Sequence, residues 1–232
     1  MTASNPACVA PTIAERFADV RLHIEKACQA AGRKPSDVVL TAVSKTQAND
    51  ALVEALATGQ TVFGENRVQE AYSHWEHRRE GLELRLIGPL QTNKALDAVR
   101  LFDVIETLDR EKLAAALADA QNKTGRQVRV LVQVNTGTEE QKAGVLPAEA
   151  DSLIALARDR YGLKVEGVMC IPPASDEPQN HFNLLKSIAD RNGLNVISMG
   201  MSGDYETAIS LGATHVRVGS ALFGERKPPK TT

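Results

Sequence analysis

One lysine stands at the point where a strongly apolar segment of the sequence ends. Residues 38–43 are apolar except for Thr41, and a helical pattern begins soon afterwards near Asn49. Such a segment is typical of a buried parallel strand, and Lys45 then lies at its carboxyl end, where parallel α/β folds collect their active sites. A desolvated lysine amine has a lowered pKa and can form a Schiff base with carbonyl compounds. The alternative is a strand-end lysine whose amine simply reaches solvent.

Two segments near the end of the sequence could bind an anion. Ser202 precedes one predicted helix, while Gly219 and Ser220 begin a very short one. In α/β barrels, phosphate sites often form from the loops after the last two strands, where backbone N–H groups face the anion. Serine and glycine are also common as helix caps and turn residues, so these loops alone leave both interpretations open.

Arg217 interrupts an apolar segment in the last predicted strand, between Val216 and Val218. Its guanidinium points either into the mouth of a barrel or outward toward the surrounding helices. An outward arginine would form a salt bridge between helix and strand. An inward arginine would donate hydrogen bonds to a ligand that, given the two loops above, carries a phosphate group.

A scaffold that could position these residues follows from the alternation of strands and helices along the sequence. Eight short apolar segments are each followed by a helical pattern, which predicts a single (β/α)8 TIM barrel. The predicted strands cover residues 38–43, 61–63, 84–87, 103–106, 128–134, 163–169, 196–199 and 215–218. A doubly wound open sheet is the alternative, but its Gly-x-Gly-x-x-Gly turn is absent after the first strand.

A further amphipathic helix is predicted over residues 11–31, before the first strand. Thr12 and Glu15 suit a capping box, and Gly32 is placed to end the helix. We expect this helix to pack outside the barrel or to close one end, with an oligomer contact as the alternative. Because no linker divides the chain, we expect one domain over residues 1–232, with frayed termini at 1–10 and 227–232.

The composition excludes several classes of function. A net charge of −2 provides no basic surface for nucleic acid and no polybasic patch for a membrane. No apolar segment is long enough to span a membrane, and the first ten residues lack the pattern of a signal peptide. The three cysteines are far apart in the sequence and indicate reduced thiols, so we expect a cytoplasmic protein.

Two other chemistries fit the sequence poorly. A serine hydrolase built on Ser202 would need the pattern Gly-x-Ser-x-Gly, but residues 200–204 lack the second glycine. The five histidines fall in no metal-ligand spacing, and His74 and His77 are expected on a polar helix. We therefore expect neither a serine nucleophile nor a metal site.

An ordered set of motifs gives the chain a specific resemblance. Each motif alone is weak, but together they run from residue 42 to residue 224 and cover nearly the whole chain. They are Ala42-Val43-Ser44-Lys45-Thr46, Phe63-Gly64-Glu65-Asn66-x-Val68-Gln69-Glu70, Ile87-Gly88-x-Leu90-Gln91-x-Asn93-Lys94, Val132-Gln133-Val134-Asn135, Lys142-x-Gly144, Met199-Gly200-Met201-Ser202-x-Asp204 and Val216-Arg217-x-Gly219-x-x-x-Phe223-Gly224. The chain resembles the YggS/PROSC family of pyridoxal phosphate homeostasis proteins, which bind pyridoxal 5'-phosphate (PLP).

This resemblance implies a fold and a set of binding residues. The fold is a barrel similar to the amino-terminal domain of alanine racemases. PLP would form a Schiff base with Lys45, its phosphate would bind the loops after the last two strands, and Arg217 would lie near the pyridine nitrogen. The implied PLP-binding residues are Lys45, Asn66, Met201, Ser202, Arg217, Gly219 and Ser220.

The chain departs from the family pattern at two places. A second lysine and a proline of the family are replaced by Gln47 and Ala48, and an aromatic–histidine pair before Ile-Gly is replaced at residues 84–86, where Arg85 stands. We expect neither departure to touch the binding residues. Lys142 matches a family lysine and either offers a second amine for aldehydes or is a solvated loop lysine.

The resemblance implies a protein that holds PLP and delivers it to PLP-dependent apo-enzymes, as a monomer or a weak homodimer. The alternative is a PLP-dependent enzyme such as a weak amino-acid racemase. An arginine beside the pyridine nitrogen discourages ring protonation and so weakens the ring as an electron sink. Racemisation also needs a second acid or base, which alanine racemases take as a tyrosine from a further domain. Here the sequence ends soon after its eighth unit and only Tyr205 comes near a strand-end motif, so we expect a binding protein.

Overall fold

Eight parallel strands form a closed barrel in the computed structural model, which describes residues 10–224. Each strand pairs with its neighbours in sequence, and the last strand pairs with the first, with Arg217 opposite Thr41. The strands are β1 (Val39–Val43), β2 (Val62–Glu65), β3 (Glu83–Leu86), β4 (Val104–Leu108), β5 (Arg129–Gln133), β6 (Lys164–Met169), β7 (Val196–Ser198) and β8 (His215–Val218). The predicted barrel is confirmed.

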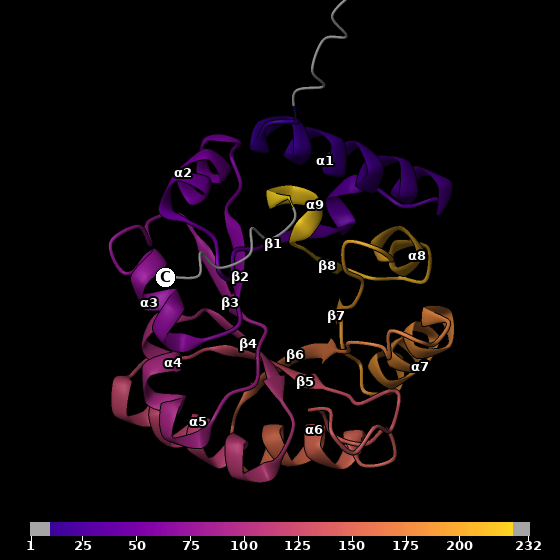
Figure 1. Ribbon diagram of the computed structural model, residues 1–232. Helices are drawn as coiled ribbons and strands as arrows, with labels where there is room; N and C mark the ends of the chain where they lie inside the picture. Colours follow the sequence, from indigo (N-terminus) through magenta and orange to yellow (C-terminus); the bar gives the residue numbers. More distant parts are fainter. Residues whose placement is uncertain (1–9, 225–232) are drawn as a thin grey trace, which may run out of the picture.

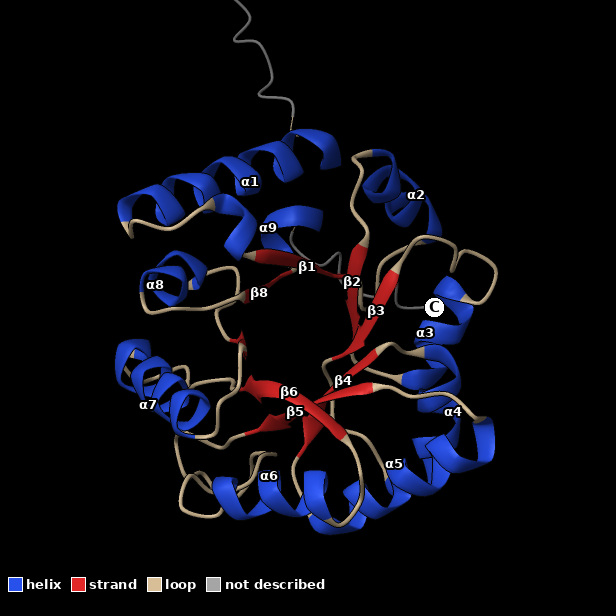
Figure 2. Ribbon diagram, turned by 180° about the vertical axis from the view of Figure 1, so that it is seen from behind, coloured by secondary structure: helices blue, strands red, loops and turns tan. Residues whose placement is uncertain are grey.

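The helices form a ring around the strands, as the two views along the barrel show (Figures 1 and 2). They are α1 (Ile13–Ala30), α2 (Asn49–Ala57), α3 (Val68–Trp75), α4 (Ala95–Leu101), α5 (Glu111–Thr124), α6 (Ala150–Asp159), α7 (Pro178–Arg191), α8 (Tyr205–Ser210) and α9 (Ser220–Phe223), with the short 3-10 helices η1 (Pro35–Asp37) and η2 (Thr92–Lys94). Because helices cover one face of the sheet and the barrel interior covers the other, strand residues such as Ile105 and Val132 are completely buried.

Helix α1 lies outside the strand ring and packs against α2, α8 and α9 (Figure 1). Its capping box forms as predicted: the N–H of Thr12 donates to the Glu15 carboxylate at 2.7 Å, and the N–H of Glu15 donates to the Thr12 hydroxyl at 3.2 Å. The ring of Phe17 is fully buried and meets Phe223 of α9 edge-on, with centroids 5.9 Å apart. Packing outside the barrel is confirmed, while an oligomer contact stays a prediction.

Two helix starts differ from those that the sequence pattern predicts, which are a cap at Asp109 and a start at Pro147. Helix α5 has Arg110 rather than Asp109 as its N-cap, because the Asp109 carboxylate pairs with the Arg110 guanidinium at 2.5 Å. Helix α6 begins at Ala150 rather than at Pro147, since the N–H of Glu149 donates to the carbonyl of Leu146 at 2.9 Å and closes a turn there. Aspartate and proline favour turns as well as helix starts, so the sequence pattern alone could not separate the two.

Several predictions concern residues outside the described range or properties that the structure does not test. The termini that were predicted to fray, residues 1–10 and 227–232, lie outside the described range except for Ala10. Cys8 lies outside it too. Cys28 and Cys170 are buried free thiols. Among residues 10–224 no helix is both long and apolar enough to cross a membrane. The single domain over residues 1–232, the cytoplasmic location and the monomer or weak homodimer stay predictions.

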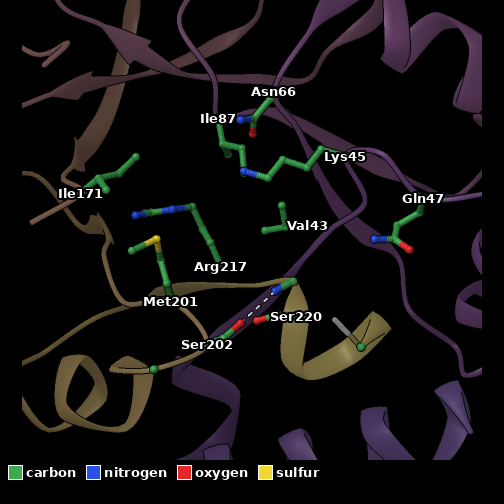
Figure 3. Close-up of a pocket in the computed structure, with 13 residues that line it drawn as sticks. Val43, Lys45, Gln47, Asn66, Ile87, Ile171, Met201, Ser202, Arg217 and Ser220 are labelled. Atoms are coloured by element: carbon green, nitrogen blue, oxygen red, sulfur yellow. Dashed lines mark hydrogen bonds between the residues drawn. The ribbon is translucent and has the colours of Figure 1, made fainter. Parts of the chain in front are cut away.

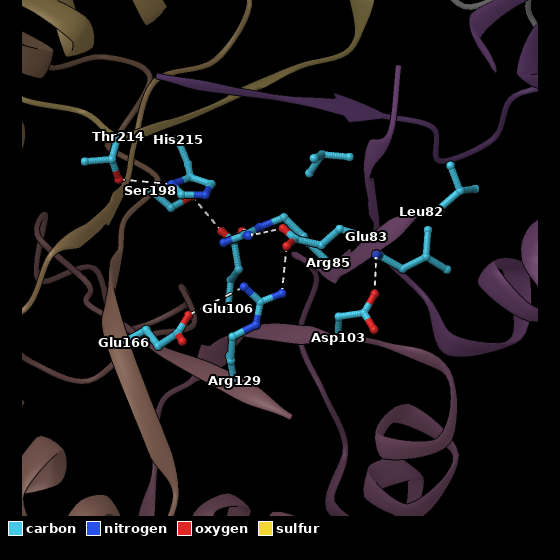
Figure 4. A network of polar contacts seen from close by, with 12 residues as sticks. Leu82, Glu83, Arg85, Asp103, Glu106, Arg129, Glu166, Ser198, Thr214 and His215 are labelled. Atoms are coloured by element: carbon cyan, nitrogen blue, oxygen red, sulfur yellow. Dashed lines mark hydrogen bonds and ion pairs between the residues drawn. The ribbon is translucent and has the colours of Figure 1, made fainter. Parts of the chain in front are cut away.

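The barrel interior holds charged side chains as well as aliphatic ones (Figure 4). Arg85 of β3 is 2% exposed and donates to the carboxylates of Glu106 and Glu83, both at 2.5 Å. Glu83 also accepts from Arg129 of β5 at 2.7 Å, and Arg129 lies 3.7 Å from Glu166. An unpaired buried ion would lose its hydration without compensation, so this alternation of charges is what allows the arginines inside the barrel.

His215 at the start of β8 faces these charges, and burial lowers its pKa to about 4 (Figure 4). The charges of Arg85 and Arg129 contribute to this lowering of the pKa, while Glu106 and Glu83 oppose it. A histidine in the unfolded chain has a pKa of about 6.5 and takes up its proton first as the pH falls. The folded state therefore loses stability between about pH 6.5 and pH 4, by roughly 3 kcal/mol in total, and is unaffected by this group at higher pH.

The variant His215→Gln is expected to remove this part of the pH dependence, because glutamine is similar in size and does not titrate. Urea unfolding near pH 7 and near pH 5 measures the effect. Between these values the native protein should lose roughly 2 kcal/mol more stability than the variant. Equal losses in the two proteins would show that His215 can be protonated in the folded state without penalty.

Candidate functional site

A cavity of about 330 Å³ opens at the carboxyl ends of the strands. This volume is typical of small-molecule sites. All seven predicted binding residues line it, namely Lys45, Asn66, Met201, Ser202, Arg217, Gly219 and Ser220. Figure 3 shows the amine of Lys45, the guanidinium of Arg217 and the hydroxyls of Ser202 and Ser220 around the same space. The structure thus brings the predicted residues together, while their contacts with a ligand stay a prediction.

Lys45 follows β1 closely, and the bend of the chain beside it is held by hydrogen bonds. Thr46 has a φ of +63°, a left-handed conformation that is unusual for a β-branched residue. Its N–H donates to the carboxylate of Glu70 on α3, and the N–H of Gln47 donates to the carbonyl of Ser44 at 3.2 Å. Backbone strain of this kind persists only where surrounding contacts enforce it. These contacts fix the backbone that presents Lys45 to the cavity.

A buried carboxylate lies behind this bend. Glu65, the last residue of β2, is completely buried, and its Oε1 accepts hydrogen bonds from the Ser44 hydroxyl at 2.6 Å and the Trp75 indole at 2.9 Å. The Nδ1 atom of His74 lies 2.9 Å from the same oxygen, and this hydrogen bond raises the pKa of His74. His74 lies on a helix as predicted, and its ring packs against this buried carboxylate. Its partner comes from another element, so the spacing of histidines could not reveal it.

Three groups of the kinds that bind metals also meet here, contrary to the expectation from histidine spacing. Ligand atoms of Glu65, Glu70 and His74 all lie within 4.8 Å of one another. Glu70 and His74 are four residues apart on α3, which places them on one face of the helix. Glu65 and Glu70 already accept hydrogen bonds from Ser44 and Thr46, on either side of Lys45. In the structure, these two carboxylates therefore stabilise the bend of the chain at Lys45.

Another side of the cavity offers hydrogen-bond donors to an anion. The N–H group of Gly219 points at the Ser202 hydroxyl at 3.3 Å (Figure 3), and that of Ala221 points at the same hydroxyl at 3.5 Å. Both distances lie at the long end of the hydrogen-bond range, so these groups can still donate to a further acceptor. The hydroxyls of Ser202 and Ser220 are two more donors beside the same space. Converging backbone N–H groups and hydroxyls fit a phosphate group well.

The loop that carries Ser202 has a tightly defined backbone. Gly200 has a φ of +90°, and a Cβ atom at this position would lie 2.6 Å from the Cβ of Ala208, so only glycine fits. The N–H of Met201 donates to the carboxylate of Asp204 at 2.6 Å. These two restraints place Ser202 opposite the start of α9.

Arg217 points into the barrel, which decides between the two orientations that the sequence left open. The residue is 3% exposed; one terminal N–H donates to the Ser198 hydroxyl at 2.6 Å and another to the carbonyl of Cys170 at 2.7 Å. Its guanidinium borders the cavity (Figure 3). Burial raises the pKa of Cys170 to about 12, so its thiol stays protonated at neutral pH.

Some lining residues lie outside the predicted set: Val43, Gln47, Ile87, Ile171, Gly203 and Gly224. Ile87 and Ile171 follow β3 and β6 closely, so their position at strand ends was the signal that could have identified them. Gln47 is one of the departures from the family pattern, which we expected not to touch the binding residues; it lines the same cavity as they do. Lys142 does not line this cavity, and its amine pairs with Glu139 at 2.6 Å.

The cavity therefore combines an amine, a set of hydrogen-bond donors that can bind an anion, and a buried cation. An amine on one side can attack an aldehyde, while the donors on another side hold a phosphate group on the same molecule. Between them, Arg217 can donate to an acceptor atom. This combination fits a phosphorylated aromatic aldehyde that carries a ring nitrogen.

Comparisons with known proteins agree with this chemistry. The family model described as alanine racemase, N-terminal domain, matches residues 19–227. The pyridoxal phosphate homeostasis protein of Escherichia coli strain K12 is 38% identical over 226 residues, which cover 92% of this chain and 97% of that protein.

Solved structures resemble the whole barrel. The structure of PipY from Synechococcus elongatus with PLP bound is 34% identical, with a TM-score of 0.78, and the match covers 92% of this chain and 100% of PipY. An alanine racemase from Clostridium difficile is 14% identical, has a TM-score of 0.71 and shares the fold alone; the match covers 94% of this chain and 59% of the racemase. The chain therefore belongs to the alanine racemase N-terminal domain family and, within it, to the pyridoxal phosphate homeostasis proteins.

Proposed function

We propose that this protein binds PLP and acts in PLP homeostasis, holding the cofactor and delivering it to PLP-dependent apo-enzymes. The observation that carries the proposal is that the Lys45 amine, the hydrogen-bond donors around Ser202 and the Arg217 guanidinium share one cavity. The name of the E. coli relative and the PLP-bound structure of PipY support it.

Lys45 is the proposed attachment point, through a reversible Schiff base between its amine and the aldehyde of PLP. The phosphate group binds Ser202, Gly219 and Ser220, whose hydroxyls and N–H groups face the same side of the cavity. Two anchors, one covalent and one formed by hydrogen bonds, hold two different groups of one small molecule. Loss of either anchor alone leaves the other in place, which suits a protein that must also release its ligand.

Arg217 donates to the pyridine nitrogen in this proposal, while Asn66 and Met201 lie beside the ring. Arginine stays protonated at any physiological pH, so the ring nitrogen accepts its hydrogen bond and remains unprotonated. PLP supplies an electron sink for carbanion chemistry, and an unprotonated ring is a weak sink. The proposed contacts therefore hold the cofactor and limit its reactivity toward amino acids.

A carrier rather than an enzyme is proposed because the tyrosines of the described chain lie away from the cavity. Racemisation needs a second acid or base across from the lysine. The hydroxyl of Tyr72 donates to the carbonyl of Asp97 at 3.2 Å, and that of Tyr161 donates to Glu111 at 2.9 Å. Tyr205 is buried at the start of α8 and does not line the cavity. The shared fold with alanine racemases favours the alternative, a weak amino-acid racemase.

Loading and release test the proposal. The protein mixed with PLP should show a visible absorption band and should then restore the activity of an apo-transaminase, with the same amount of free PLP as the control. Deuterium exchange at the α-carbon of alanine tests the alternative, and we expect it to be slow. A protein that retains no PLP after gel filtration would contradict the proposal. Fast racemisation that Lys45→Ala abolishes would identify an enzyme instead.

A further inference from the structure

The guanidinium of Arg217 is the end of a chain of hydrogen bonds that crosses the barrel. Its Nη1 donates to the Oγ of Ser198 on β7 at 2.6 Å. The Oγ of Ser198 donates to Oε2 of Glu106 on β4 at 2.6 Å, and Oε1 of Glu106 accepts from Nε of Arg85 at 2.5 Å (Figure 4). Ser198 and Glu106 are both completely buried. The contacts therefore join four strands, β8, β7, β4 and β3, without help from solvent.

The chemistry of these groups fixes the direction of each hydrogen bond. A serine hydroxyl carries one proton, an ionised carboxylate only accepts, and a guanidinium only donates. Ser198 must therefore give its proton to Glu106 and accept the proton of Arg217. Reversing either bond would leave two acceptors or two donors facing each other. The Arg217 guanidinium has one satisfied orientation in this arrangement.

Glu106 is the counter-charge for two buried arginines. Its Oε2 lies 4.0 Å from Nη1 of Arg217, and its Oε1 binds Arg85 directly. Burial acts to raise the pKa of Glu106, but the charges of Arg85 and Arg217 outweigh it and hold the pKa below its usual range. The carboxylate stays ionised, and the hydroxyl of Ser198 lies between it and Arg217 as a spacer.

Arg85 stands where the chain departs from the family pattern, and it does not line the cavity, but other side chains link it to a predicted binding residue. The side chain is 2% exposed and its charge is shared between Glu106 and Glu83. Through Glu106 and Ser198 it is connected to Arg217. The sequence could not show this, because these three residues and Arg217 belong to four different strands.

We propose that Ser198 and Glu106 are positioning residues for the cofactor, which hold the Arg217 guanidinium so that its remaining N–H groups face the pyridine nitrogen. The inference rests on the proposed function and deepens it. Without the Ser198 hydroxyl, Nη1 loses its acceptor, and the guanidinium can turn toward the Glu106 carboxylate and away from the cavity. The ring nitrogen would then lose its donor while the other anchors of the cofactor remain.

The experiment is 15N NMR of the protein loaded with PLP that carries 15N in the pyridine ring. A hydrogen bond moves the resonance of a pyridine nitrogen upfield, so Ser198→Ala should shift it downfield, toward the value of an unprotonated ring without a donor. In the background of Arg217→Gln, the same substitution should change nothing further. A Ser198→Ala resonance at the native position would overturn the inference, as would a full Ser198→Ala shift in the Arg217→Gln background.

Thr214→Val is the matched control, because it also removes a hydroxyl beside β7, one that accepts the N–H of Ile197 at 2.8 Å, and it keeps the shape of the side chain. Thr214 does not line the cavity, so this substitution should lower the melting temperature without shifting the resonance. Should Ser198→Ala fail to fold, Glu106→Asp, which withdraws the carboxylate by one methylene group, is expected to give the same downfield shift. A native protein that binds no labelled PLP contradicts the proposed function, whereas bound PLP with an unmoved resonance contradicts only this inference.

Discussion

Lys45→Ala is expected to abolish the visible absorption band that PLP develops on binding, because the band requires an imine between the aldehyde and an amine. Titration of the purified protein with PLP measures the loss. In the native protein, borohydride reduction followed by peptide mass analysis should place the phosphopyridoxyl group on Lys45. The phosphate anchor around Ser202 is untouched by the substitution, so equilibrium dialysis should still detect weak binding.

Lys142→Ala is the control for this result, since Lys142 pairs with Glu139 outside the cavity. That variant should keep the band and the label on Lys45. A band that survives in Lys45→Ala, with Lys142 or Lys94 labelled instead, would mean that the attachment point is elsewhere.

Ser202→Asp is expected to weaken PLP binding by more than about 100-fold, since like charges 4 Å apart at a protein surface repel by about 4 kcal/mol. The new carboxylate would also accept the N–H groups of Gly219 and Ala221, which now point at the serine hydroxyl. A dianionic phosphate would then meet a negative charge in place of its donors. Fluorescence or absorbance titration measures the change in affinity.

Two comparisons isolate the charge. Asparagine has nearly the same shape as aspartate but no charge. Ser202→Asn should therefore weaken binding only by the loss of one hydrogen bond to a charged group, roughly 1.5–3 kcal/mol. Pyridoxal, which lacks the phosphate, should bind the Asp and Asn variants about equally. If the two variants lose the same affinity for PLP, the phosphate group does not bind beside Ser202.

The mouth of the cavity is suited to a ligand that enters and leaves. Ile171 and Met201 line the cavity and are 37% and 38% exposed, so no element closes over them within the described residues. Deeper in the cavity, by contrast, the floor contains Arg217, which Ser198 and Cys170 hold in place by hydrogen bonds. A fixed floor and an open mouth agree with the proposed holding and release of a cofactor.

Patterns within the sequence determined the architecture. The alternation of apolar strands with amphipathic helices predicted the barrel, because each strand must be buried on both faces and each helix on one. The same argument placed Lys45 at a strand end and Ser202, Gly219 and Ser220 after the last two strands. All of these are local properties, since a strand end is defined by its own neighbours in sequence. The ordered motifs then added the identity of the ligand through the resemblance to a family.

Tertiary structure alone decided how the side chains meet across the barrel. The inward orientation of Arg217 depends on Ser198, and the charge of Arg217 is balanced by Glu106, which lies on a strand across the barrel interior. His74 has a polar neighbour in Glu65 only because α3 packs beside the end of β2. Hydrogen bonds and ion pairs act over a few ångströms of space, and barrel closure brings together residues that are far apart in the sequence. No periodicity or spacing along the chain encodes such a distance.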